Sequence, residues 1–482
     1  MRRIADRVAD LVVEHLARLP EEPVFRPYPS ELAQALVSAP PPERGVTPDQ
    51  ILDEFAELIE PYPFGNGHPR FFGWVNSPPA PMAVFGEALA AAMNPSVAGG
   101  NHAAVWIEHQ VLEWFKSIFG LPSAARGLLV SGGSMATLTA LAVARHSATD
   151  GAVRTDGIQG QQAPLAVYMS EEGHSCIRKA VELLGIGSRY LRTIGVDGDY
   201  RMRPDALESA IRSDLAAGLR PMAVAASAGT VNSGAVDPLP EILEICRRQR
   251  VWCHVDAAYG GPAILTERYR GLLAPLAEAD SVALDPHKWL FVPIEAGLVL
   301  VRDGAAMREA FSLVPPYLRT DDRVGGIGGP PWFSEFGFQQ TRGFRALKVW
   351  MALKRHGLDG YREAIDRNLD LAARLAQRIE GRRELELVAA GLSIVCFRVA
   401  PVAMAGDAAA LESLNRAVLE DIQLGGQVFL SSTVLEGRFC LRACIVNPRT
   451  SAGDVDAVVD LVADATKRLA NLPAQRRPAH RT

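Results

Sequence analysis

Apolar and polar residues follow two different periods along this chain, and each period predicts a different kind of element. Between about residues 86 and 355, short apolar or β-branched runs are followed by stretches in which apolar residues recur every three or four positions. The short runs predict buried strands and the longer stretches predict helices. This alternation favours a mainly parallel sheet with helices on both faces and ligands at the carboxyl ends of the strands. The predicted strands are 127–130, 165–169, 222–226, 251–255, 281–284 and 297–301.

The N-terminal pattern is purely helical. A second helical segment is predicted near 47–59, after a proline-rich break at 39–43. Such short helices cannot bury an apolar stripe alone, so we expect them to pack on the main body or on a second copy of the chain. A homodimer is the plainer expectation. The stripe of the first predicted helix consists of Ile4, Val8, Leu11, Val12 and Leu16.

Beyond residue 368 the pattern changes again. A helix precedes apolar strands at 392–399 and 439–446, and a last helix is predicted over 453–469. This order is typical of a small α+β domain. We therefore expect an N-terminal helical segment, a large domain and a small C-terminal domain, at residues 1–85, 86–360 and 361–482.

Composition excludes several classes of protein. The 482 residues are 48% hydrophobic and 22% charged, with a net charge of −5. This balance gives no reason to expect a nucleic acid partner, and no apolar stretch is long enough to predict a membrane span. The six cysteines include no Cys-x-x-Cys pair, so we expect buried thiols, no metal site and a cytoplasmic protein.

Two separated residues carry the candidate chemistry. Asp256 follows the apolar run at 251–255, and Lys288 follows the run at 281–284. This order suits pyridoxal 5'-phosphate (PLP), because a lysine amine can bond to the cofactor aldehyde while a buried carboxylate keeps the pyridine nitrogen protonated. Upstream, Ser131-Gly132-Gly133-Ser134 stands between a predicted strand and a predicted helix. Backbone N–H groups at a helix N-terminus bind phosphate.

These motifs resemble a known family. Asp256-Ala257-Ala258-Tyr259 and Asp285-Pro286-His287-Lys288-Trp289 resemble the group II PLP-dependent decarboxylases, which include the aromatic amino acid, histidine and glutamate decarboxylases. The similarity runs from His68 to about Leu461. It implies an α/β protein of the fold-type I PLP-dependent transferase fold, with a seven-stranded-type sheet, that decarboxylates an L-α-amino acid.

The resemblance also implies roles for individual residues. Gly133 and Ser134 hold the cofactor phosphate, with Asp285 and His287 nearby, and His174 stacks on the ring rather than serving only as a structural residue. Thr230 and Ala258 flank the ring, although Val231 stands where the family has a second threonine. Asp256 pairs with the ring nitrogen and Lys288 carries the cofactor. We expect burial to lower the pKa of Lys288.

A second set of residues is implied for the substrate. Arg442 matches an arginine that can contact the substrate carboxylate, and the alternative for it is a surface position. Core packing is the alternative for the aromatic members of the set. Pro78-Pro79 stands where aromatic amino acid decarboxylases have a more polar stretch. The candidates are His68, Phe72, Trp74, Pro79 and Arg442.

One departure from the family bears on the product. Family decarboxylases have a loop tyrosine that returns a proton to the substrate carbon, but the only tyrosine between Ser312 and Arg345 is Tyr317, which matches another position. Trp332, Phe333 and Phe336 stand near the expected position, with Phe333 as the match and Phe336 as the alternative, and none of the three can donate a proton. Slow protonation would let O2 react and give an aldehyde, so an aldehyde synthase is the alternative to a plain decarboxylase.

Two further hypotheses about the function stay open. A β-eliminating lyase would begin from the same cofactor chemistry. A nucleotide-binding α/β protein could use the turn at 131–134, but it lacks the expected glycine fingerprint and leaves Asp256 and Lys288 unexplained.

Overall fold

The chain forms two compact units. The computed structural model describes residues 1–65, 67–313, 329–330 and 332–470. Unit 1 combines Met1–Pro78 with Asn368–Thr482, and unit 2 is Pro79–Arg367. In place of three segments at 1–85, 86–360 and 361–482, the two ends of the chain therefore share one unit. A bridge between Phe71 and Phe429 joins them directly.

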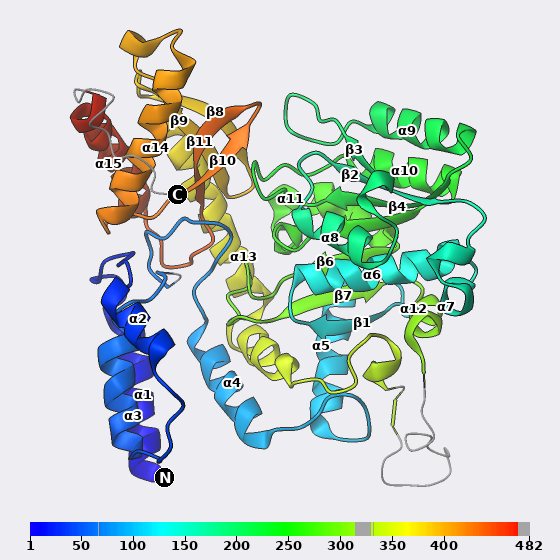
Figure 1. Ribbon diagram of the computed structural model, residues 1–482, viewed down its shortest axis with the longest axis horizontal. Coiled ribbons are helices and arrows are strands. Elements are labelled where there is room, and N and C mark those ends of the chain that lie inside the picture. The colour runs from blue at the N-terminus through cyan, green and yellow to red at the C-terminus, as the bar shows by residue number, and fades with distance from the viewer. Residues whose placement is uncertain (66, 314–328, 331, 471–482) are drawn as a thin grey trace. The chain divides into compact units, whose positions relative to one another are not determined.

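Unit 2 is built on a seven-stranded sheet with the strand order β1-β7-β6-β5-β4-β2-β3 (Figure 1). β7 runs antiparallel to both of its neighbours, and the other neighbouring pairs are parallel. The predicted α/β fold with a mainly parallel sheet is confirmed. The strands are β1 (Arg126–Val130), β2 (Leu165–Ser170), β3 (Leu191–Ile194), β4 (Arg220–Ser227), β5 (Trp252–Asp256), β6 (Ser281–Leu284) and β7 (Gly297–Val301).

Burial explains which strands the sequence pattern revealed. Every residue of β2, β6 and β7 is buried, so these strands are continuous apolar runs, as both-face burial requires. β3 lies at the edge of the sheet and only its last residue is buried. Its sequence contains Arg192 and Thr193, so the apolar run is too short to predict a strand.

Helices cover both faces of this sheet. On β5, His254 faces α6 and the preceding residue, Cys253, faces α10, with Thr137 and Cys246 as their respective contacts. Successive strand residues point to opposite faces, so α6 and α10 lie on opposite faces. The helices of unit 2 are α4 (Pro81–Met93), α5 (Ala103–Phe119), α6 (Gly133–Ala148), α7 (Val153–Asp156), α8 (Ser175–Leu183), α9 (Pro204–Ala216), α10 (Leu239–Gln249), α11 (Glu267–Leu273) and α12 (Gly304–Phe311).

Unit 1 contains a four-stranded antiparallel sheet with the order β10-β11-β9-β8. Its core packs apolar side chains of this sheet against α14, α15 and the last part of α13. This is the predicted α+β arrangement. The elements are α13 (Arg345–Glu380), which begins in unit 2, β8 (Leu385–Gly391), β9 (Ile394–Val399), α14 (Ala408–Leu424), β10 (Ser431–Leu435), β11 (Arg438–Cys444) and α15 (Ala452–Ala470).

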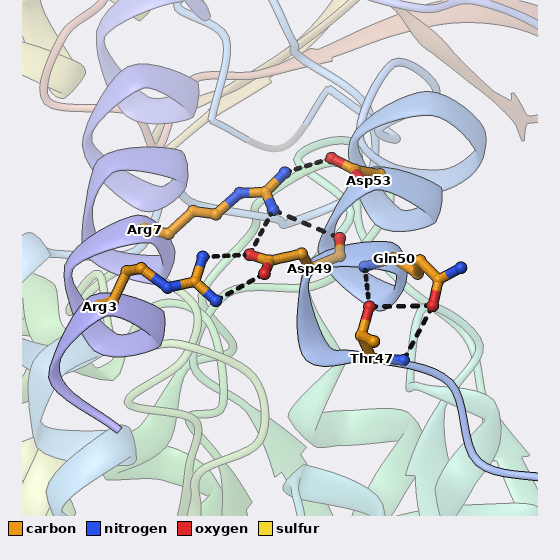
Figure 2. Close-up of polar contacts among 6 residues, drawn as sticks. All are labelled: Arg3, Arg7, Thr47, Asp49, Gln50 and Asp53. Atoms are coloured by element: carbon orange, nitrogen blue, oxygen red, sulfur yellow. Dashed lines mark hydrogen bonds and ion pairs between the residues drawn. The ribbon is translucent and has the colours of Figure 1, made fainter.

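Polar side chains connect the helix at 2–18 with the helix at 48–54 in unit 1. Arg3 donates to both carboxylate oxygens of Asp49, and Arg7 reaches Asp49 and Asp53 (Figure 2). Thr47 caps the helix Pro48–Glu54 through a capping box with Gln50. The predicted amphipathic helix is α1, and the other helical segments are α2, α3 and a π-helical turn. Their bounds are α1 (Arg2–Arg18), α2 (Ser30–Ser38), α3 (Pro48–Glu54) and Phe55–Ile59.

The structure also bears on the predictions for the cysteines and for membrane-spanning helices. Each of the six cysteines is a buried thiol, as expected. In the described part of the chain, no helix has both the length and the apolar composition needed to cross a bilayer.

Candidate active site

A cavity of about 350 Å³ lies at the carboxyl ends of the unit 2 strands. β1, β2, β4, β5 and β6 run in the same direction, so the residues that follow them meet at one edge of the sheet. All the residues predicted to bind the cofactor line this cavity. They are Gly133, Ser134, His174, Thr230, Asp256, Ala258, Asp285, His287 and Lys288.

Lys288 follows β6 and pairs with Asp285, three residues earlier in the chain, at 2.9 Å. Burial lowers the pKa of the Lys288 amine, but the charges of Asp285 and Asp256 and the hydrogen bond to Asp285 outweigh burial and hold this pKa above the ordinary lysine value. The expectation that the pKa would be lowered is therefore wrong. It considered desolvation and omitted the second carboxylate, which is contributed by the same short motif.

Asp256 is the last residue of β5, and its carboxylate points into the same cavity. Its Oδ1 accepts a hydrogen bond from the backbone N–H of Ala258 at 3.1 Å, which fixes the direction of the side chain. Ala257 and Ala258 are both buried and small. These small side chains therefore leave space for a flat ring beside the carboxylate.

The N-terminus of α6 forms another wall. The first N–H groups of a helix have no acceptor within the helix, so they face the cavity as donors. A Cβ at Gly133 would lie 3.0 Å from Asp285 Oδ2 and 3.2 Å from Ala258 Cβ. Glycine thus permits the close approach of this turn to its neighbours, and a larger residue would push against both contacts.

Asp285 supplies a direct sign that the cavity accepts a polar group. Its Oδ1 is buried and has no hydrogen-bond partner within the part of the chain that the structure describes. Buried polar atoms in native proteins are nearly always satisfied. A bound group with a donor at this point would complete the site, and the donors of α6 suit an anionic group beside it.

His174 lies at the N-terminus of α8. Its Nδ1 accepts from the backbone N–H of Cys176 at 3.2 Å, so the neutral ring carries its proton on Nε2. Burial lowers the pKa of His174, while the charge of Asp256 opposes this effect. A neutral, oriented imidazole in the cavity wall can pack against an aromatic ring.

Thr230 belongs to a turn whose flanking backbone is held by the buried carboxylate of Asp237. The Thr230 hydroxyl pairs with Ser233 at 2.8 Å, and Asp237 accepts from the backbone N–H groups of Ser227 and Met202, each at 2.7 Å. Burial raises the pKa of Asp237 to about 6. Sequence reasoning missed Asp237, because an Asp-Pro pair after a turn resembles many ordinary turns.

The residues predicted to contact substrate have different environments. In unit 1, Phe72 belongs to the hydrophobic core, which is the packing alternative, and His68 is buried with Nδ1 accepting from Arg70 N. The buried guanidinium of Arg442 donates to the carbonyl oxygen of Trp74 at 2.9 Å, whereas the Trp74 side chain is 45% exposed. Pro79 lies in unit 2 and is half-buried.

Phe333 is not among the residues that line the Lys288 cavity. Its buried ring stacks on His109 with 4.5 Å between centroids, and the Arg342 guanidinium carbon lies 4.9 Å from the ring centre. This environment gives Phe333 a packing role, and its assignment to catalysis remains a prediction. Tyr317 lies outside the described residues.

The fold and the cavity together fit a PLP enzyme. The α6 donors suit its phosphate, Asp256 suits its ring nitrogen, and Lys288 is the amine in reach of its aldehyde. No other cavity-lining residue within the described part of the chain has an amine.

Comparisons with known proteins specify the family. Residues 29–400 match the pyridoxal-dependent decarboxylase conserved domain. The chain is 33% identical to an aromatic-L-amino-acid decarboxylase of Bacillus atrophaeus, covering 94% of this chain and 93% of that protein. It is 28% identical to a phenylacetaldehyde synthase of Arabidopsis thaliana, with 93% and 92% covered.

A solved structure agrees. The crystal structure of Oryza sativa TDC with PLP and tryptamine has a TM-score of 0.89 at 27% identity, with 98% of each chain covered. This chain belongs to the family of pyridoxal-dependent decarboxylases. It is a PLP-dependent enzyme that decarboxylates an amino acid.

Proposed function

We propose that the enzyme decarboxylates an aromatic L-amino acid and that the cavity residues hold PLP as the sequence predicts. When bound, PLP supplies an aldehyde for the amino group and a ring that withdraws electrons from the α-carbon. Lys288 would hold the cofactor through its aldehyde, Asp256 would keep the ring nitrogen protonated, and His174 would pack against the ring.

Trp74 in unit 1 is the substrate contact that the family resemblance predicts for an aromatic side chain. Its ring stacks on Phe64 with 5.0 Å between centroids, and the two side chains are each 45% exposed. The Trp74 backbone has a left-handed φ of 46°. The Arg442 guanidinium and the Ser431 hydroxyl bind its carbonyl and its N–H. Half-exposed rings on a fixed backbone suit the binding of another flat ring.

A panel of L-amino acids tests this proposal. We expect CO2 release from phenylalanine, tyrosine or tryptophan and a much lower rate with glutamate or 2,4-diaminobutyrate. Trp74→Ala should raise KM for the aromatic substrate about tenfold or more, because a stacked aromatic contact is lost, whereas Trp74→Phe should keep most of the affinity. Preference for an acidic or diamino substrate would contradict the aromatic assignment.

A second candidate product is an aldehyde. No tyrosine occurs between residues 318 and 344, so the hydroxyl that family decarboxylases use to return a proton is absent from that stretch. An oxygen electrode and product analysis distinguish the outcomes. Equal amounts of CO2 and amine without oxygen uptake indicate the plain decarboxylase, and oxygen uptake with aldehyde, ammonia and peroxide indicates the alternative.

We also propose a cytoplasmic homodimer. Buried free thiols suit a reducing compartment. In α1, no residue is buried, and Val13 is 57% exposed. Neighbouring helical segments add Val37, Ile51 and Ile59 as exposed apolar side chains. Sedimentation of the holoenzyme should give a dimer that Val13→Asp weakens. A fully active monomer at low concentration would contradict the dimer.

A further inference from the structure

His254 is a fully buried histidine directly behind the active site. It lies on β5 two positions before Asp256, so both side chains point to the same face of the sheet. That face is covered by α6. The His254 Nε2 atom lies 3.3 Å from Thr137 Oγ1 on this helix.

The other ring nitrogen contacts a neighbouring strand. Nδ1 of His254 lies 2.9 Å from Ser281 Oγ on β6, and this oxygen accepts from the indole N–H of Trp252 at 2.8 Å. Because the indole N–H can only donate, the Ser281 hydroxyl hydrogen is available to Nδ1. Both ring nitrogens of His254 thus have a hydroxyl partner, Ser281 on a strand and Thr137 on the helix. Burial supports the neutral form by lowering the pKa of His254 to about 4.

This hydrogen-bonded chain ends at the cofactor cavity. Thr137 follows Gly133 by four positions, so both lie on one face of α6. Its hydroxyl also bonds to the thiol of Cys176, a residue that lines the cavity. The Cys176 N–H in turn holds the His174 ring. One imidazole thus connects the strand of Asp256 to the helix that binds phosphate.

We propose that His254 is a positioning residue that sets the distance between the phosphate-binding end of α6 and the carboxylate of Asp256. In PLP a planar ring carries the phosphate on a short CH2–O arm, which limits how far the phosphate can lie from the ring nitrogen, so both ends bind well only when these two sites are correctly spaced. A side chain that merely filled the core could be apolar. His254 instead uses both ring nitrogens, one toward a strand and one toward the helix.

Binding of PLP and of pyridoxal, which lacks the phosphate, tests this role. Dissociation constants are measured by absorbance titration of cofactor-free protein, and melting temperatures of the same samples report folding. His254→Phe and Thr137→Val should weaken PLP binding about tenfold, the size expected for one lost buried hydrogen bond. Their affinity for pyridoxal should change less than twofold, so the preference for the phosphorylated form falls.

Two matched variants serve as controls. Thr137→Ser keeps the hydroxyl and should keep the preference of the unmodified enzyme. Thr139→Val removes a hydroxyl from the same helix that bonds only to Met135 O among the contacts described, and it should also keep that preference. Thr137→Val decides the question if His254→Phe does not fold. Equal weakening for PLP and pyridoxal, or a lower melting temperature with an unchanged preference, would overturn the proposal.

Discussion

The cofactor cavity of unit 2 and the N-terminal helices of unit 1 both depend on carboxylates and cations, but in opposite environments. Around the cavity, Asp285 and Lys288 are closely paired with little solvent. Between α1 and α3, Arg3 and Asp49 pair on the surface, with side-chain exposures of 73% and 36%. Water screens the surface pair and not the buried one.

The two regions should therefore differ in how sensitive they are to the loss of a charge. In the interior, a charge without its partner is costly, so each buried group fixes its neighbours in place. On the surface, a lost partner is replaced by water. The cavity should therefore respond strongly to single substitutions, whereas the N-terminal helices should tolerate them.

The largest effect is expected from Lys288→Ala. The variant should lose turnover and the visible absorbance of covalently bound cofactor, because no other amine lines the described part of the cavity. Lys116→Met is the matched control, since Lys116 is also a buried lysine of unit 2 but bonds to Glu113 and Ser123. Turnover by Lys288→Ala would refute the cofactor assignment.

Asp256→Asn should lower kcat about a hundredfold or more while keeping the cavity intact. Asparagine retains an oxygen for the N–H of Ala258 but lacks the negative charge that keeps the ring nitrogen protonated. Losing one electrostatic contact to a reacting centre typically costs a hundredfold to a thousandfold. Steady-state kinetics with melting curves would check this, and a near-normal kcat would exclude the role.

Glu108→Gln should lower the stability of unit 2, because Glu108 belongs to a buried ion pair. The carboxylate of Glu108 pairs with Arg342, and the two side chains are 0% and 2% exposed. Removing the charge leaves the guanidinium buried without a counter-ion, which should reduce the free energy of unfolding by about 3–5 kcal/mol. Urea denaturation measures this change. A loss as small as that of a surface pair would break the contrast between the two regions.

Arg3→Ala should give the smallest effect, a small decrease in the urea midpoint at neutral pH, because water and Arg7 replace part of the lost contact to Asp49. The hydrogen bond from Arg3 lowers the pKa of Asp49 from 3.8 to about 2. A lowered carboxyl pKa stabilises the folded state above pH 3.8, and this contribution is lost as the pH falls toward 2. Unfolding curves across that window should converge for the variant and the unmodified protein at the acidic end.

Much of the cavity could be predicted because its residues follow buried strands. Parallel strands bring their carboxyl ends to one edge, so short motifs after 130, 256 and 284 were expected to converge. The structure also brings Cys176, Tyr259 and Glu295 to the cavity. Tyr259 belongs to the motif that begins at Asp256 but was given no role, and no motif distinguishes Cys176 or Glu295 from ordinary turn or core positions.

Other properties depend on contacts between distant residues, which a local pattern does not contain. The pKa of Lys288 depends on two carboxylates, and one of them comes from another strand. The buried position of Phe333 depends on His109 and Arg342. Phe72 and Trp74 are both aromatic residues of one short motif, so the sequence does not distinguish them. In the structure Phe72 lies in the hydrophobic core and Trp74 is half-exposed.

Release of CO2 from carboxyl-labelled aromatic L-amino acids tests the central claim most directly. The holoenzyme should release one CO2 for each amino acid consumed, whether the organic product is an amine or an aldehyde, and Lys288→Ala should release none. Consumption of amino acid with ammonia and a keto acid as products, but without CO2, would contradict the account and identify an eliminating enzyme.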